Sequence, residues 1–114
     1  MSGMTPKLYR ENFIILMVLQ ALFGTLSPNL KALTLEFGDN NDIVAHFLLR
    51  QESDADREEI EENFPTEVSV MTNGIELGDG TELGEVLAVP VIEFVADHEP
   101  GYVPPGRRIL KFRD

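Results

Sequence analysis

Two segments with a period of two, separated by a run of turn-forming residues, constrain the fold of this chain most strongly. The period runs through residues 30–37 and again through residues 43–49. The apolar positions are Leu33, Leu35, Phe37, Ile43, Ala45, Phe47 and Leu49. Because side chains alternate between the faces of a strand, each segment predicts a strand with one buried face. The intervening Gly38–Asp42 favours turns, so we expect the two strands to form a hairpin.

The segment before the hairpin predicts a helix and not a leader or a membrane span. Phe13–Leu19 is an unbroken apolar run, but it is far shorter than the roughly 18–20 residues that cross a bilayer. No small-residue cleavage site follows it before Gly24. Thr5 suits a helix N-cap, Pro6 the first helical position and Gly24 the helix end. We therefore expect a helix that packs within the fold, no membrane partner and a cytoplasmic location.

A second, strongly acidic helix is indicated after the hairpin. Ser53 is a good N-cap, and Pro65 marks the predicted end. The acids between them are Asp54, Asp56, Glu58, Glu59, Glu61 and Glu62. Early acids suit the positive end of the helix dipole, whereas Glu61 and Glu62 lie near its negative end and gain nothing there. The apolar stripe is narrow, so most of this helix must face water or a partner, and a solvated face that aids solubility is the simpler explanation.

Three further strands are predicted in the second half of the chain. Residues 67–72 and 86–95 indicate strands, and a glycine-rich acidic loop over residues 73–85 separates them. Residues 108–113 indicate a short last strand. Pro90 cannot donate a hydrogen bond to a strand ladder, so we expect its strand at a sheet edge or with a bulge.

These elements predict an α+β fold in the order αββαβββ. We expect one sheet whose further strands are antiparallel, with the helices on one of its faces. A chain of 114 residues fits one domain over residues 1–114. The chain has no cysteine, which excludes disulfides and thiolate zinc sites.

Motifs for catalysis or metal binding are not recognised. His46 and His98 lack the spacing of a metal site such as H-x-x-x-H. Ser53 and Ser69 lie outside any G-x-S-x-G context. The oxygen-rich loops lack the glycine and the terminal Glu of a calcium-binding loop. We therefore expect no enzyme activity, no metal and no cofactor.

Acidic residues are concentrated in the middle of the chain. Between Glu36 and Glu99 stand eighteen Asp or Glu residues and only Arg50 and Arg57 as bases. The few bases in residues 107–113 do not offset a net charge of −11, so nucleic acid is not an expected partner. A surface of one charge sign attracts an oppositely charged protein and accelerates the encounter.

Two short motifs link the chain to a known family. The first enters the hairpin and comprises Gly24, Ser27, Pro28, Asn29, Leu30, Lys31 and Ala32. The second opens the acidic helix with Asp56, Glu58 and Glu59. With these motifs the chain resembles the small bacterial immunity proteins of contact-dependent growth inhibition and related polymorphic toxin systems. The resemblance covers about residues 8–71 and, more loosely, 110–113, whereas the segment 73–84 is longer than the family pattern.

The resemblance implies that the chain binds and neutralises a cognate toxin. Toxins of such systems are frequently nucleases, and a nuclease presents positive charge to its substrate. We therefore hypothesise that an acidic surface of this chain covers the active site or substrate groove of a basic toxin. The leading patch comprises Asp54, Asp56, Glu58, Glu59, Glu61 and Glu62. The second choice comprises the loop acids Glu76, Asp79, Glu82 and Glu85.

Two other functions fit the same residues. A DNA-mimic inhibitor of a nucleic-acid enzyme would share the acidic surface without a toxin partner. An adaptor or structural subunit would use the apolar helix at Phe13–Leu19 for contact and its acids for solubility. A toxin gene directly upstream distinguishes immunity from the first alternative, and salt-sensitive binding distinguishes it from the second. Oligomeric state stays open at this stage.

Overall fold

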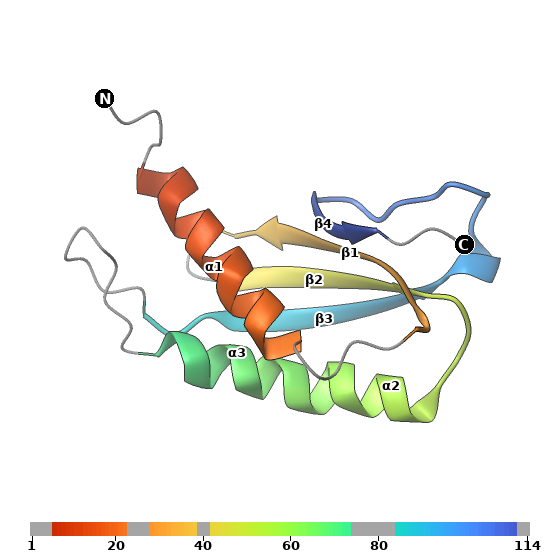
Figure 1. Ribbon diagram of the computed structural model, residues 1–114, viewed down its shortest axis with the longest axis horizontal. Coiled ribbons are helices and arrows are strands. Elements are labelled where there is room, and N and C mark those ends of the chain that lie inside the picture. Colours follow the sequence, from red (N-terminus) through yellow and green to blue (C-terminus); the bar gives the residue numbers. More distant parts are fainter. Residues whose placement is uncertain (1–5, 23–27, 39–41, 74–83, 112–114) are drawn as a thin grey trace.

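The computed structural model describes residues 6–22, 28–38, 42–73 and 84–111. These residues form helices and a four-stranded sheet (Figure 1). The first helix, α1, spans Pro6–Leu22 and has the predicted proline at its first position. The predicted caps Thr5 and Gly24 lie outside the described residues.

The predicted hairpin is confirmed. Strands β1 (Leu30–Phe37) and β2 (Asp42–Leu49) pair antiparallel, with Leu33 opposite Phe47 and Leu35 opposite Ala45. These four side chains are at most 1% exposed. The period of two therefore identified the strands, their pairing and their buried face.

The sheet has the strand order β3-β2-β1-β4. Strand β4 (Arg107–Lys111) pairs antiparallel with β1, and β3 (Leu87–Phe94) pairs with β2. The edge position predicted from Pro90 is confirmed. The prediction that all further strands are antiparallel was wrong for β3, which runs parallel to β2. A long helix between β2 and β3 returns the chain to the sheet end where β2 begins, as a parallel connection requires.

That connection is one continuous helix, here called the long helix. It comprises α2 (Asp54–Glu58), a π-helical turn η1 (Glu59–Asn63) and α3 (Phe64–Thr72). The predicted helix end at Pro65 was wrong, because the helix continues through this proline into α3. The wider π turn directly precedes it, and the Phe64 N–H bonds the Glu59 carbonyl five residues back.

The predicted strand over residues 67–72 was also wrong, since these residues belong to α3. Val68 and Thr72 are fully buried, whereas Val70 between them is 70% exposed. This burial at intervals of four follows the helical period. The observed order is therefore αββαββ, with one strand fewer than predicted.

The helices cover one face of the sheet, called the covered face, as the prediction of an α+β fold required. In Figure 1, α1 crosses in front of the strands and the long helix runs beside β3. Val18 of α1 and Val68 of α3 are fully buried against the strands. The rings of Phe47 and Phe64 meet edge to face with centroids 5.1 Å apart. The core therefore lies between the two helices and the sheet.

The other face, called the open face, is partly covered by a loop. A 3₁₀ turn, η2 (Val95–Asp97), leads from β3 into the loop of residues 98–106. The hydroxyl of Thr34 donates a hydrogen bond to the Pro105 carbonyl over 2.6 Å. Gly106 has φ +105°, and a Cβ there would lie 2.6 Å from the Leu35 carbonyl oxygen. The loop therefore approaches β1 more closely than a side chain at position 106 would allow.

Candidate functional site

Hydrogen bonds fix both ends of the long helix: its start carries an N-cap, and its end is bonded to the segment that leads into β3. At its start, the Ser53 hydroxyl accepts a bond from the Asp56 N–H over 3.3 Å, as the predicted N-cap should. At its end, the Thr72 hydroxyl accepts the Val86 N–H over 2.8 Å and donates to the Val68 carbonyl over 2.7 Å. The carboxylates of the helix therefore sit on a rigid element.

Asn29 connects the start of this helix to the hairpin. Its side-chain amide donates to the Gln51 carbonyl over 2.7 Å and to the Asp56 carboxylate over 3.0 Å, and it accepts the Gln51 N–H over 2.9 Å. Its own carbonyl accepts the Arg50 N–H over 2.8 Å. Asn29 and Asp56 belong to the two motifs noted above, and the structure gives both residues a role in the fold.

The six predicted helix acids lie on one element but in three different situations. Asp56 is bonded to Asn29. Glu61 lies 3.5 Å from Arg57, which also binds Glu52 through two contacts of 3.1 Å. Hydrogen bonding to Glu52, and then its charge, raise the pKa of Arg57.

The remaining helix acids have no such partner. Asp54, Glu58 and Glu62 are exposed, and within the described part of the chain none of them forms an ion pair. Glu59 is half-buried. Their four-residue intervals place Asp54, Glu58 and Glu62 on one side of a helix, here called the acidic face.

Only one of the four predicted loop acids lies among the described residues. Glu85 is exposed and accepts a short hydrogen bond from the Ser69 hydroxyl of α3. Glu76, Asp79 and Glu82 lie outside the described residues. The structure therefore places one of these four acids beside the long helix and does not test the others.

A cluster on the open face brings both histidines to Glu93. His46, only 8% exposed, has Nε2 2.5 Å from Glu36 Oε1 and Nδ1 3.8 Å from Glu93 Oε1. Glu93 Oε2 lies 2.8 Å from His98 Nε2 and accepts the Tyr102 hydroxyl over 2.9 Å. The rings of His98 and Tyr102 stack with centroids 3.7 Å apart. The hydrogen bond from the Tyr102 hydroxyl to Glu93 is the main cause of the raised pKa of Tyr102.

Sequence reasoning treated the two histidines separately and missed this cluster. The hairpin register could have placed His46 and Glu36 on one face, but Glu93 joins them only through the parallel pairing of β3. Among the described residues, no three His, Asp or Glu side chains form a group that could hold a metal ion. The cluster ties the loop of residues 98–106 to the sheet.

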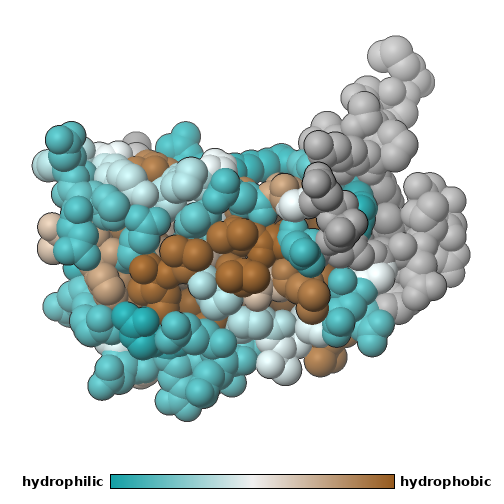
Figure 2. Space-filling view, turned by 180° about the vertical axis from the view of Figure 1, so that it is seen from behind, coloured by the Kyte–Doolittle hydropathy of each residue, from teal (hydrophilic) through white to brown (hydrophobic). Residues whose placement is uncertain are grey.

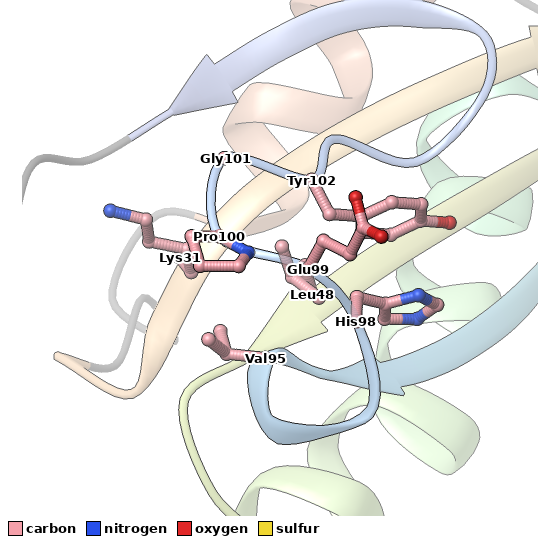
Figure 3. Close-up of a pocket in the computed structure, with 8 residues that line it drawn as sticks. All are labelled: Lys31, Leu48, Val95, His98, Glu99, Pro100, Gly101 and Tyr102. Atoms are coloured by element: carbon pink, nitrogen blue, oxygen red, sulfur yellow. The ribbon is translucent and has the colours of Figure 1, made fainter.

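A cavity of about 400 Å³ lies between this loop and the end of the sheet (Figure 3). The rings of His98 and Tyr102 lie on one side of it and Lys31 on the other. The remaining lining residues are Leu48, Val95, Glu99, Pro100 and Gly101. Because the two rings already contact Glu93 and each other, we assign the cavity no reactive role.

Comparison with known families decides the class of protein. The model of the MafI2 immunity protein family matches residues 11–77, more than half of the chain. The chain belongs to this family. The match covers most of α1, the hairpin and the long helix, and it ends before β3. A search of curated proteins found no significant match.

Family membership confirms the resemblance to immunity proteins of bacterial toxin systems. An immunity protein neutralises a toxin by binding it, so its functional site is a protein-binding surface. In the part of the chain that the structure describes, no helix has the length and apolar character to span a membrane.

Proposed function

We propose that this immunity protein neutralises its toxin by placing the acidic face of the long helix against a basic surface of the toxin. The observation that carries the proposal is the exposure of Asp54, Glu58 and Glu62, none of which forms an ion pair within the described residues. Carboxylates without a partner form charge-assisted hydrogen bonds to Lys and Arg side chains. The fixed helix ends reduce the entropy that binding would otherwise cost.

A toxin that acts on nucleic acid fits this surface best. Such an enzyme presents positive charge to a polyanionic substrate, and an acidic protein competes for the same groups. The net charge of −11 adds long-range attraction to the contacts made by the helix. Binding at the substrate groove or active site then blocks access without any catalytic step by the immunity protein.

The predicted acids contribute unequally in this proposal. Asp56 and Glu61 already have partners in Asn29 and Arg57, so they stabilise the helix and contribute less to binding. Glu59 lies beside the acidic face and is half-buried. The loop acids Glu76, Asp79, Glu82 and Glu85 remain a second contact region.

Co-expression tests the function. The chain is produced together with the protein encoded immediately upstream, and both growth and co-purification are scored. We expect growth rescue and a stable complex. If neither is observed, the immunity function with this partner is refuted.

A charge-reversal pair tests the site. Glu58→Lys with Glu62→Lys should reduce the association rate about 10- to 100-fold at low salt, and the difference should shrink as salt increases. The matched control reverses Asp97 and Glu99, two exposed acids outside the long helix, with the same change in net charge. Equal rates for the two pairs would refute the acidic face as the site while the function stands.

A further inference from the structure

The open face of the sheet carries exposed apolar side chains at its outer strand. Leu87 and Val89 of β3 are each 53% exposed. Val89 pairs with Val44 of β2, which is half-buried on the same face. Figure 2 views the molecule from behind and shows apolar residues gathered across this face. We call Val44, Leu87 and Val89 the open patch.

The loop of residues 98–106 explains why only this half of the face is open. Ala32 and Leu48 also face away from the helices, yet they are 1% and 2% exposed. The loop covers Leu48, which lines the cavity beneath it, and the loop is held in place by Thr34 and Glu93. The loop covers the open face only as far as the cluster around His46. The open patch lies beyond that boundary, where no described segment covers it.

Acidic residues border the open patch. Asp42 pairs with Leu87, Glu36 pairs with Val44, and Glu85 lies just before β3. All three are exposed. A second copy of this chain would bring an equally acidic border against this one, and like charges at an interface are repulsive. A partner with apolar side chains flanked by Lys or Arg fits the patch instead.

The acidic face and the open patch can contact one partner. Arg57 of α2 lies 6.0 Å above the ring of Phe94 at the end of β3, so the long helix adjoins this edge strand. Figure 1 shows the helix running beside β3, and Figure 2 shows the apolar surface with hydrophilic residues along the corresponding lower edge. The two surfaces therefore lie along the same edge strand, with the open patch at its beginning and the start of the long helix at its end.

The two surfaces also provide complementary contributions to binding. Stable interfaces have a desolvated apolar centre within a polar rim, and a few central residues carry most of the affinity. Exposed charges mainly set the association rate. The acidic face has no exposed large apolar residue between Asp54 and Glu62, so it lacks such a centre.

We propose that the open patch is the apolar centre of the toxin interface, with the toxin lying across the edge strand β3 and reaching the acidic face. This inference rests on the proposed function. It also places part of the recognition surface beyond residues 11–77, in the segment that the family match does not cover.

Binding kinetics of the full chain with the upstream-encoded toxin test the inference. Leu87→Ser and Val89→Ser should each weaken binding about tenfold, mainly through faster dissociation, and the effect should persist at high salt. The matched control is Leu16→Ser, which changes a leucine of α1 that is 55% exposed, against 53% for Leu87. Thermal unfolding of each variant checks that the fold is retained.

The outcomes separate this inference from the function on which it rests. Absence of a wild-type complex removes both. A wild-type complex that is sensitive to Glu58→Lys with Glu62→Lys, but equally insensitive to Leu87→Ser and Leu16→Ser, overturns the open patch alone. Sedimentation of the chain without toxin gives a third readout. Loss of a dimer in Leu87→Ser with unchanged toxin affinity would assign the patch to a second copy and overturn the proposal.

Discussion

Both faces of the sheet carry large apolar side chains, which are buried on the covered face and half exposed at the edge of the open face. On the covered face, Leu33, Leu35 and Phe47 are at most 1% exposed. On the open face, Leu87 and Val89 are 53% exposed beside Glu36 and Asp42. Apolar character alone therefore does not separate core from interface. A substitution should affect stability where the side chain packs against the helices, and binding where it faces water or a partner.

The acids of the long helix show the same division at closer range. Asp56 and Glu58 are two residues apart, yet the first is bonded to Asn29 and the second has no ion pair within the described residues. Both residues lie in the same acidic stretch of the sequence, so the local charge does not distinguish them. Only the packing of the hairpin against the helix distinguishes a carboxylate that fixes the fold from one available to a partner.

The largest effect expected from this comparison is on stability at the covered face. Leu35→Ala removes a fully buried side chain and should lower the free energy of unfolding by about 2–5 kcal/mol. The same substitution at Leu87 should cost less than about 1 kcal/mol, because that side chain is already half in water. Urea unfolding of both variants measures the difference. A comparable loss for Leu87→Ala would show that other parts of the chain bury the open patch.

A smaller effect is expected where the loop closes over the open face. Gly101 and Gly106 both have positive φ, but a Cβ at position 106 would lie 2.6 Å from the Leu35 carbonyl oxygen and one at 101 would contact nothing within 4 Å. Gly101→Ala should therefore cost about 1 kcal/mol from backbone conformation alone. Gly106→Ala should cost clearly more, because β1 must move. Equal losses in urea unfolding would contradict the close approach of the loop to β1.

The hairpin and the start of the long helix could be predicted because their signals are local. The period of two at Leu33 and Leu35 reports burial on one face, and Ser53 caps a helix through its own neighbourhood. Pro90 likewise indicated an edge strand without reference to any partner. Each of these inferences depends on residues close together in the chain.

The predictions that failed required long-range information. Val68 and Val70 alternate as in a strand, and only the packing of Val68 against the core reveals the helix. The direction of β3 depends on how the long helix crosses the sheet. The link between Glu93 and His46 spans two strands, and the open patch exists only because the loop stops short of it. Charge composition indicated the acidic helix but not which carboxylates have partners.

The next effect in size is expected at the junction between the hairpin and the long helix. Asn29→Ala removes three side-chain hydrogen bonds at a partly exposed site and should lower the free energy of unfolding by about 1–2 kcal/mol. Asn63→Ala is the control, because this exposed helix residue makes no capping bond. It should change stability by less than about 0.5 kcal/mol. Similar small changes in the stability of both variants would mean that Asn29 does not fix the long helix to the hairpin.

The smallest effect concerns the bond that holds the loop on the open face. Glu93 accepts the Tyr102 hydroxyl and raises the pKa of Tyr102 above its usual value near 10. Since the folded state retains this proton more tightly, its contribution to stability is full below about pH 10 and is lost as the pH rises through the higher folded pKa. Phenolate absorbance in a Tyr9→Phe background isolates the titration of Tyr102. Glu93→Gln should lower that pKa by removing the charge beside the hydroxyl, and an unchanged titration would mean that Glu93 does not tether the loop that bounds the open patch.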